Sequence, residues 1–185
     1  MNPNPQITRY TRAALIAITS LGLCVGAFGE GTFSPDQVEG PVTWGSVSNV
    51  THLSHLYFAG QPDQAGMEKA KAEGVSVVIN LRDPSEHAWD EKSAVEALGM
   101  TYYNVPVRGV PFDKAAFAEI ETLVKQHHGE EILVHCASSN RVGGWLATHL
   151  AGAHGMSADD AIEVGRRAGI TKQPIADAVR AFLSD

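Results

Sequence analysis

The chain has 185 residues and a formal net charge of −7, with 21 acidic and 14 basic side chains. This length is enough for one domain with a substantial hydrophobic core. The acidic balance argues against nucleic acid as a partner, because the phosphate backbone attracts basic surfaces.

The first 29 residues have the layout of a secretory signal peptide. Arg9 and Arg12 precede an acid-free apolar run, residues 13–27, and the small residues Ala27 and Gly29 stand before a suitable cleavage point. The run is short for a membrane span. We therefore expect residues 1–29 to be removed and the mature protein to be periplasmic or secreted, with no stable membrane anchor. A retained anchor is the alternative.

The rest of the chain divides into an arm and one domain. Residues 30–50 are rich in Gly, Ser, Pro and Val without a regular period, and we interpret them as an extended arm or linker. Residues 51–185 form the expected domain. The expected strands are 56–59, 75–81, 101–107 and 131–136. The expected helices are 63–73, 85–98, 113–127, 142–154, one that starts at Ser157, and 171–183. Such alternation predicts an α/β fold, with a mainly parallel sheet and helices on both faces.

The segment "LVHCASSNRVGG", residues 133–144, stands between the last expected strand and a helix. Functional sites of such sheets form at the carboxyl ends of the strands. Backbone N–H groups of the turn and of the helix start favour an anion there, and the same field stabilises a thiolate at Cys136. Arg141 can bind two oxygens of that anion, and His135 can orient the loop. We expect substrate to contact Arg141 and the four residues before it, namely Ala137, Ser138, Ser139 and Asn140.

Cysteine usage allows two interpretations. Cys24 would leave with the signal peptide, so Cys136 would be alone and could form no internal disulfide. A lone thiol in an oxidising compartment is either buried and inert or used.

The pattern "VHC…R" between strand and helix resembles the active-site loop of the cysteine-dependent protein tyrosine and dual-specificity phosphatases. Residues 57–84, "YFAGQPDQAGMEKAKAEGVSVVINLRDP", resemble the opening of the bacterial beta-lactamase-hydrolase-like phosphatase-like domains. The likeness covers roughly residues 45–155 and implies a dual-specificity-phosphatase-like fold. It also implies that Cys136 becomes a phosphocysteine while Arg141 and the loop N–H groups hold the phosphoryl oxygens.

The loop departs from the phosphatase pattern in two ways. Four residues separate Cys136 from Arg141, whereas the phosphatase loop has five. Rhodanese sulfurtransferases, which carry a persulfide on cysteine, use the shorter spacing. Phosphatases also place Ser or Thr directly after the Arg, where this chain has Val142.

The general acid is the third departure. The position that matches the Asp of dual-specificity phosphatases falls on Arg108 or Gly109. Asp113 is near, but an N-cap role suits it better. Asp83 lies at the carboxyl edge of the expected sheet and is the candidate acid. A turn residue before Pro84 is its alternative reading.

Together these features predict an exported phosphatase acting on a phosphorylated protein or a small phosphate ester. The alternatives are a rhodanese-like sulfurtransferase with a sulfur donor, and an inactive module that binds an anion or a protein. We expect no cofactor and no metal, since no third ligand accompanies His52 and His55 in the sequence.

Overall fold

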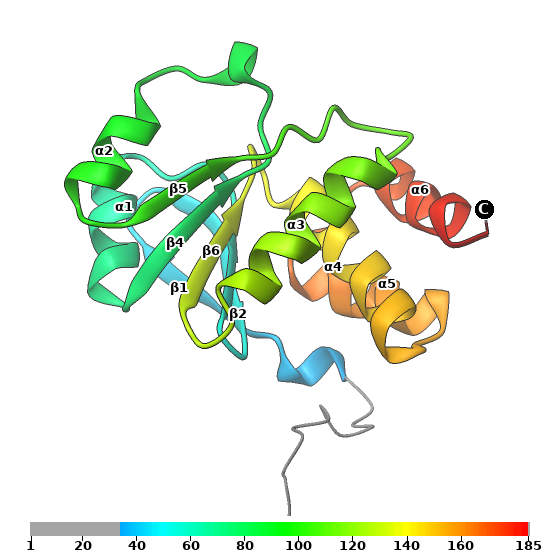
Figure 1. Cartoon of the computed structure of the whole chain (residues 1–185). Helices are drawn as coiled ribbons and strands as arrows, with labels where there is room; N and C mark the ends of the chain where they lie inside the picture. Colours follow the sequence, from blue (N-terminus) through cyan, green and yellow to red (C-terminus); the bar gives the residue numbers. More distant parts are fainter. Residues whose placement is uncertain (1–33, 185) are drawn as a thin grey trace, which may run out of the picture. The chain divides into compact units, whose positions relative to one another are not determined.

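The computed structural model describes residues 34–184, so the expected signal peptide lies outside the described residues (Figure 1). Its sheet has six strands in the order β1-β2-β3-β6-β4-β5. The strands are β1 Glu39–Trp44, β2 Val47–Leu53, β3 Leu56–Ala59, β4 Val75–Asn80, β5 Thr101–Asn104 and β6 Glu131–His135. The α-helices are α1 Gln64–Ala72, α2 Glu91–Ala97, α3 Lys114–Gln126, α4 Asn140–His154, α5 Ala158–Arg167 and α6 Gln173–Ser184. None of these helices is long and apolar enough to cross a membrane.

The sheet is mixed but mainly parallel, which confirms the expected α/β class. Strand β6 pairs in parallel with β3 and β4, and β4 pairs in parallel with β5, whereas β1 and β2 join antiparallel. Successive side chains of a strand point to opposite faces. In β4, accordingly, Val77 and Ile79 pack into one core cluster and Val78 into the other; Val75 joins the cluster of Val78 because the register shifts between Val75 and Val77.

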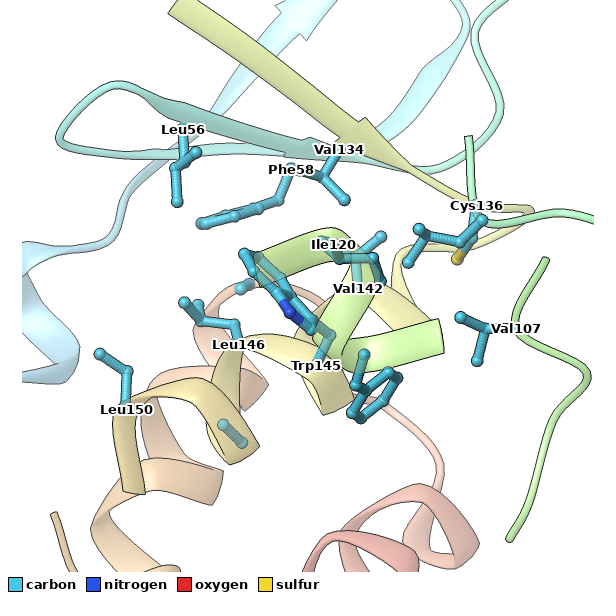
Figure 2. Packing of buried hydrophobic residues seen from close by; sticks show 14 of the residues in the cluster. Leu56, Phe58, Val107, Ile120, Val134, Cys136, Val142, Trp145, Leu146 and Leu150 are labelled. Carbon is cyan, nitrogen blue, oxygen red and sulfur yellow. The ribbon is translucent and has the colours of Figure 1, made fainter. Parts of the chain in front are cut away.

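Each core cluster is covered by its own helices (Figure 1). On one face, Met67 of α1 and Val95 of α2 complete the smaller cluster. On the other face, α3, α4, α5 and α6 complete the larger cluster, in which Ile120 and Trp145 are fully buried. Figure 2 shows Trp145 facing the sheet beside Phe58. The sheet thus lies between two helical layers, as expected.

The expectation of an extended arm at residues 30–50 has to be corrected. Residues 39–53 form the hairpin β1–β2 at the edge of the sheet. Five of the six residues of β1 are exposed. Without a buried face, this strand has no alternation of apolar and polar residues that would predict it from sequence.

The helix expected at 85–98 is also corrected. Residues Pro84–Glu86 form a short 3₁₀-helix, and α2 begins only at Glu91. Asp83 caps the first piece by accepting a hydrogen bond from the N–H of Ser85, and Asp90 caps α2 by accepting one from the N–H of Ser93. Two local caps therefore replace one continuous helix.

Candidate active site

Cys136 follows β6 directly, at the carboxyl end of the central parallel strands. Its N–H donates to the carbonyl of Ala59 in β3 (3.3 Å), and the carbonyl of His135 accepts from the N–H of Leu81 (2.9 Å). The side chain is 1% exposed. Figure 2 shows Cys136 at the border of the large core cluster, with its sulfur on the side of Val107. The strand edge thus holds the thiol at the position expected for a site in this sheet.

The loop after Cys136 presents a run of unused backbone donors. Ser139 adopts a left-handed conformation (φ 63°) and turns the chain into α4, which begins at Asn140. Apart from the antiparallel bridge that pairs Ser138 with Gly60, no N–H from Ala137 to Arg141 donates to a protein acceptor within residues 34–184. Buried backbone donors are rarely left unpaired. The loop N–H groups outside this bridge, at a helix start, form a cradle for an anion.

Arg141 is fixed over this loop by three acceptors. Glu86 binds the end of the guanidinium with both oxygens, at 2.7 Å from Nη1 and 2.8 Å from Nη2. Nη1 also donates to the carbonyls of Val107 (3.0 Å) and Leu81 (3.3 Å). Burial alone would lower the pKa of Arg141, but its hydrogen bonds to Glu86 and the charge of the nearby Cys136 raise that pKa. The guanidinium is therefore charged and held in one orientation.

The contacts of Arg141 leave one edge of the guanidinium free. A guanidinium has five N–H groups. Glu86 uses one on each Nη atom, and the two carbonyls share the second one on Nη1. In the described part of the chain, no oxygen acceptor contacts Nε–H or the second N–H of Nη2, and the remaining hydrogen-bond partner of Arg141 is the Cys136 sulfur. These two donors lie on the same edge and match two oxygens of a phosphate or sulfate group.

The ring of His135 contacts the buried carboxylate of Glu91, a residue that the sequence analysis did not identify. His135 Nε2 lies 2.8 Å from Oε1 of Glu91, and both residues are buried. Glu91 also accepts from Asn80 Nδ2 (3.1 Å) and from Gln61 Nε2. Burial is the largest effect and raises the pKa of Glu91, but the hydrogen bond and charge of His135 together with the hydrogen bond from Gln61 make the net shift downward. Glu91 is thus ionised and fixes the ring of the residue that precedes Cys136.

Ser139 and Asn140 hold the loop from the other side. Ser139 Oγ donates to the carbonyl of Ala168 (2.7 Å). Asn140 Oδ1 accepts from the N–H groups of Thr171 (2.9 Å) and Lys172 (3.1 Å). Both side chains therefore tie the loop to the segment between α5 and α6. The side-chain contacts with substrate that we expected for these two residues remain a prediction.

Asp83 lies beside the loop but is ionised. Its carboxylate accepts from the N–H and the hydroxyl of Ser85 and forms an ion pair with Arg108 (2.8 Å). The hydrogen bonds from Ser85 come first among the causes that lower the pKa of Asp83 to about 2. Glu86 also has a pKa of about 2, chiefly because Arg141 donates to it. Neither carboxyl group carries a proton at neutral pH, and Asp83 caps the 3₁₀-helix that begins at Pro84.

An open cavity of about 430 Å³ lies beside the loop, and Cys136 itself is not among its lining residues. Its charged lining consists of Asp83, Glu86, Arg108, Arg141 and Lys172. The remaining lining residues are small, polar or aliphatic: Ser85, Gly109, Ala137, Ser138, Asn140 and Ile175. Among residues 34–184, no group of three His, Cys, Asp or Glu side chains is arranged to hold a metal ion. The cavity therefore brings Arg141 and Asp83 together beside the loop that Cys136 begins.

Comparisons with known proteins support the same fold. No family model and no curated protein match this chain. Among solved structures, a DUF442 protein of Shewanella putrefaciens, provisionally named a phosphatase, is 20% identical with a TM-score of 0.63, covering 75% of this chain and 88% of that protein. TpbA of P. aeruginosa is 18% identical with a TM-score of 0.65 and coverages of 80% and 91%.

A third similar structure is the kinase associated phosphatase KAP, at 17% identity and a TM-score of 0.62, covering 70% of this chain and 85% of KAP. Sequence identities of 17–20% support a shared fold but do not establish a shared reaction. The chain therefore has the fold of the cysteine-dependent protein tyrosine and dual-specificity phosphatases.

Proposed function

We propose that this chain is an exported, cysteine-dependent phosphatase that hydrolyses phosphate monoesters through a phosphocysteine on Cys136. The observation that carries the proposal is the set of free donors around the thiol. Among the described residues, the loop N–H groups outside the Gly60–Ser138 bridge have no acceptor, and no oxygen contacts Nε–H of Arg141, which also hydrogen-bonds the Cys136 sulfur. A phosphoryl group offers three oxygens to such donors. Export rests on the sequence of residues 1–29 alone.

In the proposed reaction, the thiolate of Cys136 attacks phosphorus, and the bond from phosphorus to the ester oxygen breaks. The leaving oxygen takes its proton from water, since Asp83 and Glu86 are ionised. Water then attacks phosphorus, the S–P bond breaks, and inorganic phosphate leaves with the thiolate restored. Without a general acid, substrates whose leaving oxygen needs a proton lose about two to four orders of magnitude in rate. Aryl phosphates are therefore the favoured substrates.

Sulfur transfer is the second candidate, favoured by the four residues between Cys136 and Arg141. In that reaction the thiolate attacks the outer sulfur of thiosulfate, the S–S bond breaks, and sulfite leaves. The product is a persulfide on Cys136, and no proton has to be delivered. The same free donors would then hold the sulfonate oxygens.

The test is the intact mass of the full chain after brief, acid-quenched incubation with an aryl phosphate or with thiosulfate. An aryl phosphate is suitable because a structure of TpbA contains phosphotyrosine. Cys136→Ser is the control, because it keeps Cys24. A phosphoryl adduct or released phosphate that requires Cys136 supports the proposal. A single added sulfur without either of these would replace it with sulfur transfer. If neither reaction occurs, the cradle is a binding site.

A further inference from the structure

The side chains that line the cavity carry more positive than negative charges. Arg141 is paired with Glu86 and Arg108 with Asp83, which leaves Lys172 as an unmatched cation. The cavity lining is therefore net positive, although the whole chain has a formal charge of −7. A positive cavity on an acidic protein attracts anions specifically to that place.

Lys172 has a fixed backbone and a free head group. Its N–H donates to Oδ1 of Asn140, which holds it against the loop that Cys136 begins. In residues 34–184, the Lys172 ammonium has no hydrogen-bond or ion-pair partner. The segment is thus anchored beside the phosphate cradle while the ammonium remains available for a ligand.

Arg108 offers further free donors at the same cavity. Only Nε contacts Asp83, and the side chain is 81% exposed. Within the described residues, neither Nη group of Arg108 has an acceptor. Arg108 and Lys172 therefore add cationic groups beyond those that the reacting phosphate would use.

The cavity lacks the features that would recognise an aromatic ring. No described aromatic side chain lines it, and its aliphatic lining is limited to Ala137 and Ile175. An aromatic group would therefore find no ring to stack on. Beyond the phosphate, the lining therefore offers polar groups (Ser85, Ser138 and Asn140) and the charged residues.

We propose that the substrate carries a second anionic group, a carboxylate or a phosphate, close to the phosphate that is hydrolysed, and that Lys172 binds this group with help from Arg108. The inference rests on the proposed phosphatase function, because it places the reacting phosphate on the cradle and on Arg141.

The test compares carboxyphenyl phosphate with carbamoylphenyl phosphate, which has the same shape without the charge. The full chain should turn over the carboxylate with a kcat/KM about fivefold higher, as expected for an exposed ion pair, and the preference should shrink at high salt. Lys172→Gln should remove most of this preference, and Lys172→Arg should restore it. Lys125→Gln, on the exposed side of α3, is the matched control. Replacing the carboxylate with a phosphonate tests whether a second phosphate is preferred.

The outcomes separate this inference from the proposed reaction. If both esters are hydrolysed with equal kcat/KM, or if Lys172→Gln keeps the preference, the second-anion site is wrong while the phosphatase stands. If neither ester is hydrolysed, calorimetric binding to Cys136→Ser decides. Tighter, Lys172-dependent binding of the carboxylate would support the site without the reaction. No binding of either ester would overturn both.

Discussion

Glu86 and the substrate phosphate would use different edges of the Arg141 side chain. Glu86 takes the end edge, so the carboxylate fixes the guanidinium without occupying the edge that would meet a phosphate. The same contact lowers the pKa of Glu86 to about 2. Positioning of the arginine and supply of a proton are therefore incompatible roles for this carboxylate.

The residue that sequence reasoning selected as a general acid can be tested directly. We expect Asp83→Asn to change kcat for an aryl phosphate by less than tenfold at pH 7, because Asp83 is already ionised and Asn keeps the helix cap. Loss of a true general acid costs about 10²–10⁴. Asp113→Asn, which alters the cap of α3 away from the cavity lining, is the matched control. A drop beyond a hundredfold in Asp83→Asn alone would restore Asp83 as the acid.

At the scale of elements, α4 depends on a close approach to α5. A Cβ atom on Gly165 of α5 would lie 2.7 Å from the carbonyl of Gly143 in α4 and 2.8 Å from Ile170 Cδ1. The first of these is backbone, so it cannot rotate away. The start of α4 carries Arg141, and this contact therefore supports the helix that positions the guanidinium.

We expect Gly165→Ala to lower the free energy of unfolding by about 1–3 kcal/mol, because the clash outweighs the better helix propensity of Ala. Gly152→Ala is the control, since Gly152 lies in α4 with open space around it. That variant should gain roughly 0.5–1 kcal/mol. Urea unfolding measures both. Equal effects of the two substitutions would mean that the helices can move apart at no cost.

Elements defined by local signals were predictable. Strand β3 and the caps Asp63, Asp113 and Ser157 are where the sequence placed them. Cys136 was likewise found at the edge of the sheet because an apolar strand precedes it. The hairpin β1–β2 was missed, because its outer strand is exposed and has no buried face to create a pattern.

The partners of the loop were not predictable. Glu86 lies 55 residues before Arg141, and Glu91 lies 44 residues before His135. Both glutamates lie in the stretch for which the sequence predicts one exposed helix. No local sequence feature therefore distinguishes them from surface charges. Their roles depend on the break between the 3₁₀-helix and α2, which directs each carboxylate toward the loop.

At the scale of the whole molecule, the Glu86–Arg141 pair links the loop at Cys136 to global stability. A carboxyl group whose pKa is lowered on folding stabilises the folded state above its ordinary pKa, and that contribution is lost as pH falls toward its folded value. For Glu86 the window runs from its ordinary pKa of 4.5 down to about 2. Asp83 should add to the loss of stability in acid, since its pKa is lowered from 3.8 to about 2.

We therefore expect Glu86→Gln to be less stable than the wild type by roughly 1 kcal/mol at pH 7, a modest value because the Glu86 side chain is 34% exposed. The difference should persist down to about pH 5 and then shrink as pH falls further, because protonation breaks the same ion pair in the wild type. Urea unfolding at pH 7, 5, 4 and 3 measures it. Glu119→Gln, on the exposed face of α3, controls for the loss of one negative charge. A difference that stays constant from pH 7 to pH 3 would show that Glu86 stabilises the fold by packing rather than by its charge.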